Sequence, residues 1–252
     1  MDTSRHHPCD DVRGLAELDA RVTGCRACPR LVQWREEAAR VKRRAYLEWD
    51  YWARPIPGFG PPDAALVLVG LAPAAHGGNR TGRIFTGDPS GDLLYRALYE
   101  LGLASQPHSV GRDDGMALHG VRITDPVRCA PPENKPTTEE RDTCRPWITK
   151  ELQLMRPTVR AVVALGGFAW QAVLPVLAAA GWIVPRPRPV FGHGARAVLP
   201  AADGGAPLDL FGCYHASPRN TYTGRLTPQM LRDLLATAAT AAGLRPASPP
   251  QS

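Results

Sequence analysis

The sequence lacks the segments that would tie a chain to a membrane or to secretion. No apolar run among its 252 residues reaches the roughly 18 residues that a membrane-spanning helix needs. Residues 1–7 include no apolar stretch of the kind found in a secretory signal, so we expect a soluble protein of the reducing cytoplasm. Disulfide bonds are scarce in that compartment, and they are therefore a poor explanation for the six cysteines.

The sequence also lacks the short motifs of several common enzyme classes. Neither the G-x-G-x-x-G dinucleotide fingerprint nor the Walker A phosphate loop occurs, which disfavours a nucleotide held in either way. The nucleophile elbow G-x-S-x-G and the zinc motif H-E-x-x-H are absent as well, which disfavours the hydrolases that use them. Only Lys42, Lys135 and Lys150 are present as lysines, so Schiff-base chemistry has few candidates.

What remains is the composition of a basic, globular protein. Hydrophobic residues make up 44% of the chain and charged residues 21%, and a net charge of +6 permits a polyanionic partner without requiring one. Residues 1–12 and 244–252 are polar or proline-rich without periodicity, which predicts flexible tails. Residues 13–243 predict a single domain between them.

Short apolar runs alternate with amphipathic segments along this domain. Four runs predict buried strands, at residues 64–70, 121–124, 161–167 and 208–214. Four segments predict helices, at residues 90–103, 137–155, 168–180 and 227–241. Ser90 is the predicted N-cap of the first helix, and Thr137 with Glu140 predicts a capping box at the second. The alternation predicts an α/β fold, with three α/β/α layers around a central, mainly parallel four-stranded sheet.

Polar loops rich in glycine and proline follow three of the predicted strands. Ligands bind beyond the carboxyl ends of parallel strands, so these loops are the candidate site. In the first loop Phe85 could stack on a nucleic-acid base or belong to the core. In the last loop His215 could donate a hydrogen bond to a substrate or hold the loop together. On the residues alone, the structural role is the better explanation for both.

Four cysteines have the spacing of a metal centre. Cys25 and Cys28 form a C-x-x-C pair, Cys129 follows a predicted strand, and Cys144 lies in a predicted helix. Four thiolates bind zinc or an iron–sulfur cluster equally well, so the residues leave the metal open. A redox pair at Cys25 and Cys28, with the other two cysteines buried as small core residues, is the alternative.

Three blocks of sequence occur in order along the chain. They read GLAPAAHGGNRTGRIFTGD at residues 70–88, VRCAPPENKP at residues 127–136 and HASPRN at residues 215–220. Together with the four cysteines they resemble the uracil-DNA glycosylase superfamily, and most closely its family 5, the type B enzymes. The resemblance covers roughly residues 25–243. It implies a monofunctional base-excision-repair enzyme that flips a damaged nucleotide out of the duplex, hydrolyses its N-glycosidic bond and leaves an abasic site.

The resemblance also implies roles for individual residues. The implied catalytic residues are His215, which would donate to a uracil oxygen, and Asp88, which would hold water or stabilise the sugar cation. Phe85 would stack on the extruded base, and the other implied base-binding residues are Gly70, Ala72, His76, Asn134 and Asn220. The implied DNA contacts are Arg80, Arg83, Arg219, Tyr222 and Arg225. The implied cofactor is a 4Fe–4S cluster held by Cys25, Cys28, Cys129 and Cys144.

Two positions depart from the pattern of the wider superfamily. Well-studied uracil glycosylases carry an acid or amide near Ala72 to position water, and alanine cannot do this. That loss is typical of family 5 and makes Asp88 the candidate, although Asp88 could instead be only an acidic residue at a helix N-terminus. Asp125 lies where family 4 has an asparagine that reads the uracil edge, and an ionised carboxylate accepts but cannot donate. Asn134 or Asn220 would then supply the amide.

The resemblance suggests uracil in double-stranded DNA as the substrate, with hydroxymethyluracil, hypoxanthine and ethenocytosine as further bases. It suggests a monomer in the cytoplasm, associated with the nucleoid and not with a membrane. One alternative is a non-catalytic iron–sulfur module of the same fold that binds damaged DNA, which the alanine at position 72 favours. Another is a zinc-stapled hydrolase that acts on nucleotides.

Overall fold

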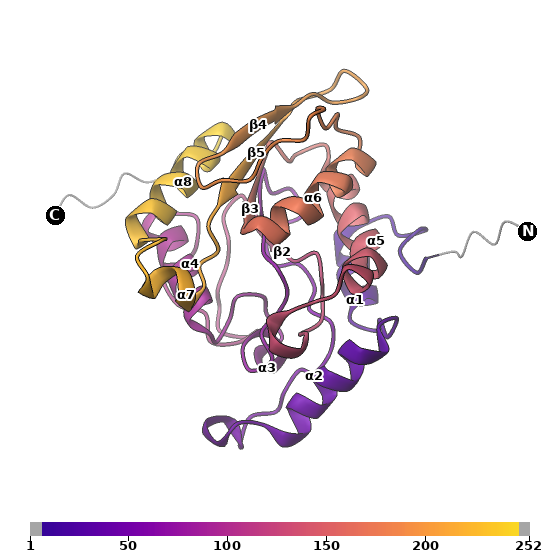
Figure 1. Cartoon of the computed structure of the whole chain (residues 1–252), viewed down its shortest axis with the longest axis vertical. Coiled ribbons are helices and arrows are strands. Elements are labelled where there is room, and N and C mark those ends of the chain that lie inside the picture. The colour runs from indigo at the N-terminus through magenta and orange to yellow at the C-terminus, as the bar shows by residue number, and fades with distance from the viewer. Residues whose placement is uncertain (1–6, 247–252) are drawn as a thin grey trace, which may run out of the picture.

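One mixed sheet forms the centre of the molecule (Figure 1). The computed structural model describes residues 7–246, and residues 1–6 and 247–252 of the predicted tails lie outside the described residues. Within that range the strand order is β2-β1-β3-β5-β4. The strands are β1 (Leu66–Val69), β2 (Val121–Thr124), β3 (Ala161–Leu165), β4 (Arg196–Leu199) and β5 (Leu208–Cys213). All neighbours are parallel except β4 and β5, which confirms the predicted α/β fold with a mainly parallel sheet.

The described sheet has five strands, and the predicted number of four is wrong because β4 was missed. β4 is a four-residue strand at the edge of the sheet, and Val198 within it is 54% exposed. Arg196 Nε of β4 donates to Asp209 Oδ1 of β5 at 2.6 Å. A short edge strand with so little buried surface has no apolar run, so hydrophobic periodicity does not detect it.

Helices cover both faces of the sheet (Figure 1). One face carries α4 (Pro89–Glu100) and α8 (Pro228–Ala241), and the other carries α1 (Leu15–Val22), α5 (Thr138–Met155) and α6 (Gly167–Ala179). The four predicted helices correspond to α4, α5, α6 and α8, with ends displaced by no more than three residues. In the described part of the chain, no helix is both long and apolar enough to cross a membrane.

The side chains of the strands alternate between two apolar cores. Leu66 and Leu68 of β1 pack in the core beneath α4 and α8, whereas Val67 and Val69 pack in the core beneath α1, α5 and α6. All four are fully buried. This is the burial expected of a parallel strand covered on both faces, and it explains why these strands read as unbroken apolar runs.

The remaining elements are short or lie beside the sheet, and are α2 (Pro29–Val41), α3 (Gly78–Thr81), α7 (Pro218–Tyr222) and the 3-10 turns η1 (Arg44–Tyr46) and η2 (Pro132–Asn134). Helix α2 is joined to α5 by Arg30, whose Nε donates to Glu140 Oε1 at 2.8 Å. The predicted capping box of α5 is confirmed. The Glu140 N–H donates to Thr137 Oγ1 at 3.1 Å, and Glu140 Oε2 accepts from the Thr137 N–H at 2.8 Å.

Packing extends beyond the predicted domain boundaries at residues 13 and 243. Cys9 and Val12 are 2% and 1% exposed and belong to the core beneath α1, α5 and α6. Leu244 packs on Gly120, and a Cβ atom at Gly120 would lie only 2.6 Å from the Leu244 side chain. Isolated apolar residues in a polar stretch give no periodic signal, so the sequence does not mark these residues as packed.

A buried ion network joins β2 to the helices beneath it. Glu151 of α5 accepts from Arg122 Nε and from Thr124 Oγ1, each at 2.6 Å. Arg128, just beyond β2, also donates to Glu151, and Arg122 Nη2 donates to both oxygens of Asp19 of α1 at 2.7 and 2.8 Å. Burial alone would raise the pKa of Glu151, but the two arginines outweigh it and hold the pKa at about 2. The carboxylate is therefore ionised at neutral pH.

Replacing Glu151 by glutamine is expected to lower the free energy of unfolding by about 3–5 kcal/mol, because two buried guanidinium groups lose their shared anion. The stabilisation should be present above the unfolded pKa of 4.5 and lost as the pH falls toward about 2. Urea unfolding measures both effects. Glu37→Gln breaks an exposed pair with Arg40 and should leave the free energy of unfolding nearly unchanged, because solvent screens this pair. Equal losses in the two variants would contradict the importance of the network.

Candidate active site and candidate metal centre

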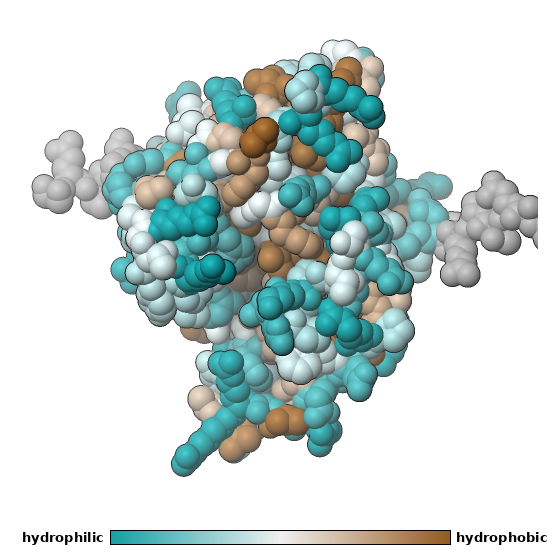
Figure 2. Space-filling model, in the orientation of Figure 1, coloured by the Kyte–Doolittle hydropathy of each residue, from teal (hydrophilic) through white to brown (hydrophobic). Residues whose placement is uncertain are grey.

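A cavity of about 670 Å³ opens at the carboxyl ends of β1, β2, β3 and β5. The chain leaves β1 and β3 toward opposite edges of the sheet, so the cavity lies at the topological switch point, where open α/β sheets bind ligands. Figure 2 shows an opening in the middle of one face, with apolar side chains inside and hydrophilic side chains around it. The three post-strand loops of the sequence blocks meet here.

Phe85 forms one wall of the cavity and is 9% exposed. Its backbone is left-handed, with φ at 51°, a conformation that costs a non-glycine residue about 1–2 kcal/mol. Two glycines pack closely against Phe85 and restrict its position. A Cβ atom at Gly91 would collide with the Phe85 carbonyl oxygen, and a Cβ atom at Gly70 would lie 2.7 Å from the Phe85 ring. The Phe85 ring is thus fixed in place, with its centroid 6.0 Å from that of His215.

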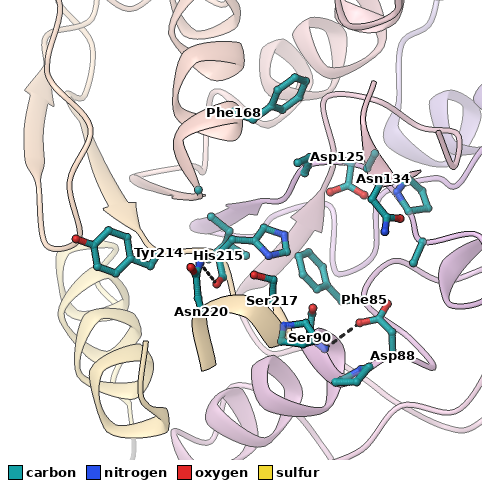
Figure 3. A pocket seen from close by; sticks show the side chains of 18 of the residues that line it. Phe85, Asp88, Ser90, Asp125, Asn134, Phe168, Tyr214, His215, Ser217 and Asn220 are labelled. Atoms are coloured by element: carbon teal, nitrogen blue, oxygen red, sulfur yellow. Dashed lines mark hydrogen bonds between the residues drawn. The ribbon is translucent and has the colours of Figure 1, made fainter. Parts of the chain in front are cut away.

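His215 lies across the cavity from Asp88, at the end of β5 (Figure 3). Asn220 holds the loop, since its Nδ2 donates to the His215 carbonyl oxygen at 2.8 Å. Burial lowers the pKa of His215, so its imidazole is neutral at neutral pH and can donate one hydrogen bond without carrying charge. Asn220 also lines the cavity, and its amide uses one of its two N–H groups on His215, which leaves the second N–H and the amide oxygen for a ligand.

Asp88 uses one carboxylate oxygen for the fold and leaves the other at the cavity. Its Oδ1 accepts from the N–H groups of Ser90 and Gly91 at 3.0 and 3.1 Å, so Asp88 and not the predicted Ser90 is the N-cap of α4. Its Oδ2 lies beside Gly77, where a Cβ would be 2.5 Å away. Burial raises the pKa of Asp88, although both N–H groups oppose the shift. Ala72 lines the same cavity and offers no polar side chain.

Asp125 and Asn134 lie near each other at the inner end of the cavity (Figure 3). Asp125 follows β2 and is 2% exposed. Asn134 is presented by the turn η2, in which Glu133 and Asn134 both have positive φ, at 54° and 56°. Asparagine adopts this conformation more readily than most residues, which suits it to such a turn.

Six predicted ligand contacts lie outside the cavity lining, namely Gly70, His76, Arg80, Arg83, Arg219 and Tyr222. Arg83 is 6% exposed and is paired with Asp114 at 2.5 Å, and Arg80 is 4% exposed with its guanidinium 4.0 Å from the centroid of the Tyr46 ring. Both arginines are buried by the fold, and neither lines the cavity, so the structure adds no support to the predicted DNA contacts at these residues. His76 Nδ1 lies 3.0 Å from the hydroxyl of Tyr51, and His76 does not line the cavity either, so its contact with a base stays a prediction.

The other predicted DNA contacts lie near the mouth of the cavity. Tyr222, at the end of α7, is 84% exposed, and Arg219 of the same helix is also exposed. Arg225 lines the mouth, and its guanidinium lies 4.4 Å from the centroid of the Tyr214 ring. A basic residue that the sequence did not single out, Arg43, lines the cavity as well.

Phe168 and Phe191 are further lining residues that the sequence analysis missed. Phe168 follows Gly166 and Gly167 directly after β3, so the rule that ligands bind beyond strand ends applies to it as well. Phe191 lies in a long irregular segment before β4, and no pattern in the sequence marks it.

The four cysteines of the predicted metal centre line a second, small cavity together with Leu31. Two N–H groups point at their sulfur atoms. Arg35 Nη1 donates to Cys129 Sγ at 3.0 Å, and the Arg128 N–H donates to Cys144 Sγ at 3.4 Å. The six cysteines are free, and Cys9 and Cys213 lie away from this cavity.

The donor set fits an anionic, polynuclear group better than a single zinc ion. Arg35 is 2% exposed, its Nε has no partner, and no carboxylate pairs with it among the described residues, so its charge lacks an anion apart from the thiols. Sulfur ligands of one zinc ion lie about 3.8 Å apart, since each Zn–S bond is about 2.3 Å. No three of these four sulfur atoms lie within 4.8 Å of one another.

Comparison with known proteins points to one family. Residues 57–239 match the family model described as "Uracil DNA glycosylase superfamily". A "Type-5 uracil-DNA glycosylase" of Mycobacterium tuberculosis is 54% identical over 230 residues, which cover 91% of this chain and 82% of that protein. A "Type-5 uracil-DNA glycosylase" of Thermus thermophilus is 50% identical over residues that cover 88% of this chain and 96% of that protein. A "Type-4 uracil-DNA glycosylase" of Pyrobaculum aerophilum is 30% identical over 65% of this chain and 66% of its own.

Asp88→Ala is expected to lower the free energy of unfolding by about 1 kcal/mol, because α4 loses its N-cap. Asp88→Ser keeps an acceptor for the same N–H groups and should stay within about 0.5 kcal/mol of the wild type. Urea unfolding of both variants measures the difference. Equal losses in the two would mean that the cap does not stabilise α4.

Proposed function

The chain belongs to the uracil DNA glycosylase superfamily, and we propose from this that it removes uracil from double-stranded DNA and leaves an abasic site. The observation that carries the proposal is the cavity at the strand ends, which collects Phe85 and Asp88 from the first sequence block, Asn134 from the second and His215 from the third. A base inside the duplex cannot reach such a cavity, so the nucleotide must be flipped out of the stack.

The flipped base would lie against Phe85 and accept a hydrogen bond from His215. Excision leaves negative charge on the departing uracil, and a donor aimed at its carbonyl oxygen stabilises that charge best where water is excluded. His215 is suited to this because its imidazole is neutral and its backbone carbonyl oxygen is held by Asn220. The backbone N–H of Ala72, which has no acceptor among the described residues, is available to a second base oxygen.

Asp88 would act on the sugar side of the scissile bond. As the bond to the base lengthens, the sugar develops positive charge, and the free Oδ2 of Asp88 can stabilise it or orient the attacking water. Its Oδ1 stays bound to the N-terminus of α4, so the carboxylate does not need to reorganise during the reaction. Because Oδ2 of Asp88 would act on the sugar or the water, the proposed mechanism needs no polar side chain at position 72.

The same cavity supports a wider range of bases. Its volume of about 670 Å³ lies within the usual range for small-molecule sites, about 300–1,000 Å³, and is not limited to a pyrimidine. Hypoxanthine presents a ring N–H beside a carbonyl oxygen, as uracil does. Hydroxymethyluracil presents the same pair of groups, and we include it with hypoxanthine among the proposed substrates. Ethenocytosine keeps the carbonyl oxygen, but its etheno bridge occupies the ring nitrogen, so we include it on the size of the cavity alone.

DNA would bind across the mouth of the cavity. Arg219 and Arg225 supply positive charge for phosphates, Tyr222 is exposed for contact with the duplex, and Arg43 adds charge on the lining. The enzyme would work as a monomer in the cytoplasm, on the DNA of the nucleoid.

We infer that Cys25, Cys28, Cys129 and Cys144 hold a 4Fe–4S cluster. The unpaired charge of Arg35 and the two N–H groups directed at sulfur support this assignment. When bound, the cluster would supply a covalent cross-link between the segment that joins α1 to α2, the segment after β2, and α5. Asn79 extends the connection toward the active site, since its Nδ2 donates to the Arg35 carbonyl oxygen at 3.0 Å.

Excision of uracil from a duplex, followed by alkali cleavage of abasic sites, tests the proposed function. His215→Ala should lower the single-turnover rate by about 10²–10³, the usual effect of removing one donor of this kind. Asp88→Ser keeps the helix cap but should lower the rate by at least about 10². His108→Ala, at an exposed histidine outside the cavity, is the control and should be as active as the wild type.

A wild-type protein that binds the lesion duplex without cleaving it would contradict the proposal and favour a non-catalytic damage-binding module. Cleavage that survives Asp88→Ser would leave the enzyme but remove the role of Asp88.

Protein purified without oxygen is expected to contain about four iron and four sulfide per chain. Cys129→Ser should lower the iron content, the visible absorbance and the solubility, because a thiolate ligand is lost. Cys213→Ala, at a buried cysteine outside the small cavity, is the matched control and should keep its iron. Stoichiometric zinc without sulfide in the wild type would exclude the cluster.

A further inference from the structure

Asp125 is a buried acid that the proposed mechanism does not use. It is 2% exposed, it lines the active-site cavity, and its Oδ1 has no hydrogen-bond partner among the described residues. A buried carboxyl group without a partner lowers stability, so such a group calls for a ligand that completes its hydrogen bonds.

The carboxyl group lies where the edge of a stacked base would come. A Cβ at Gly70 would collide with Asp125 Oδ1 and would lie 2.7 Å from Cε2 of Phe85, so both side chains lie directly over the same glycine. Figure 3 shows Asp125 on the inner side of the Phe85 ring, beside Asn134 and across from Asp88. A base that stacks on Phe85 therefore presents one edge to this carboxyl group.

The charged groups around Asp125 do not hold it as an anion. Arg128 is the nearby cation, but its guanidinium donates to Glu151, and no hydrogen bond joins it to Asp125. Asp88, across the cavity, and Glu151, beneath β2, both disfavour a further negative charge. Of the other polar side chains that line the cavity, His215, Asn134, Asn220, Ser90 and Ser217 are uncharged at neutral pH. The cations Arg43 and Arg225 line it as well, and neither has a hydrogen bond to Asp125.

We propose that Asp125 is a specificity-determining residue that reads the edge of the flipped base as a neutral carboxylic acid. Its O–H donates to the base carbonyl oxygen, and its other oxygen accepts from the adjacent ring N–H. The inference rests on the proposed function, because it concerns the base that the cavity binds. Uracil and hypoxanthine present the same pair of groups, so one carboxylic acid serves both.

The protonation state is consistent with this role. Burial raises the pKa of Asp125 from 3.8 to about 8, against the influence of Arg128 and with that of Asp88 and Glu151. At neutral pH the group therefore offers one donor and one acceptor, as an asparagine side chain does. The objection that an aspartate cannot donate holds only for its ionised form.

The test compares uracil excision by the wild type and Asp125→Asn from about pH 6 to about pH 10, two units either side of a pKa near 8. The wild-type rate should fall as the pH rises through about 8, and at one unit above it the rate should be about tenfold lower. Asp125→Asn cannot ionise and should lack this decrease. Both enzymes act on the same substrate, so ionisation of uracil itself affects them equally.

Stability gives a second readout that needs no substrate. The unfolded chain ionises Asp125 near 3.8 and the folded chain near 8, so burial of Asp125 lowers the stability of the wild type progressively between these values. Asp125→Asn should therefore become more stable than the wild type as the pH rises through this interval. Asp63→Asn, at an exposed acid, is the control and should show no such trend. In the wild type, the infrared band of a protonated carboxyl should vanish through about pH 8.

The outcomes separate this inference from the proposed function. If the wild type excises uracil and Asp125→Asn shows the same alkaline decrease, Asp125 does not read the base as an acid. If the carboxyl band is missing at pH 7, the group is ionised and the inference fails, whatever the rates. If the wild type excises no uracil at any pH, the proposed function fails, and the inference fails with it.

Discussion

A single buried carboxylate, that of Glu151, holds the part of the molecule on which both sites depend. It binds Arg122 and Thr124 of β2 and Arg128 beyond the strand, and so fixes the segment that runs from Asp125 at the cavity to Cys129 at the metal centre. The same interaction also affects the charge of Asp125. Because the guanidinium of Arg128 is committed to Glu151, it does not neutralise Asp125, and the active-site acid is left with burial as the dominant influence on its pKa.

The active site is consequently a place where polar groups are numerous but charge is scarce. His215 is kept neutral by burial, and Asp125 by burial and neighbouring acids, while Phe85 and Phe168 supply apolar surface. In such surroundings a hydrogen bond to a departing anion is worth more than it would be in water. The arginines collect instead near the mouth, where a polyanion can reach them.

How far the sequence predicts this structure depends on the range of the interactions involved. Local patterns identified β1, β2, β3 and β5 as apolar runs, and the capping box of α5 was visible from Thr137 and Glu140. The three loops that meet at the cavity followed from the same strands. β4 was missed because an edge strand buries too little to leave a pattern.

Long-range partners decide where individual side chains of the first loop lie. From its loop sequence Arg83 is a candidate phosphate ligand. In the structure its guanidinium forms a buried ion pair with Asp114, which lies 31 residues away in the sequence. Arg80 is likewise enclosed by the rings of Tyr46 and Trp49. A glycine-rich loop with arginines does not reveal which side chains point outward. That depends on aromatic and acidic residues that only the fold brings near.

The double use of Asp88 affects how sequences related to this one should be read. Its Oδ1 holds the N-terminus of α4, and serine, threonine or asparagine would do so about as well. Drift at this position is therefore tolerated by the fold even where it removes the carboxylate. Under the role proposed for Asp88, a related protein could keep every strand and every cysteine of this fold and still lack the carboxylate that acts on the sugar. In that case the residue before Pro89 says more about activity than identity over the whole chain does.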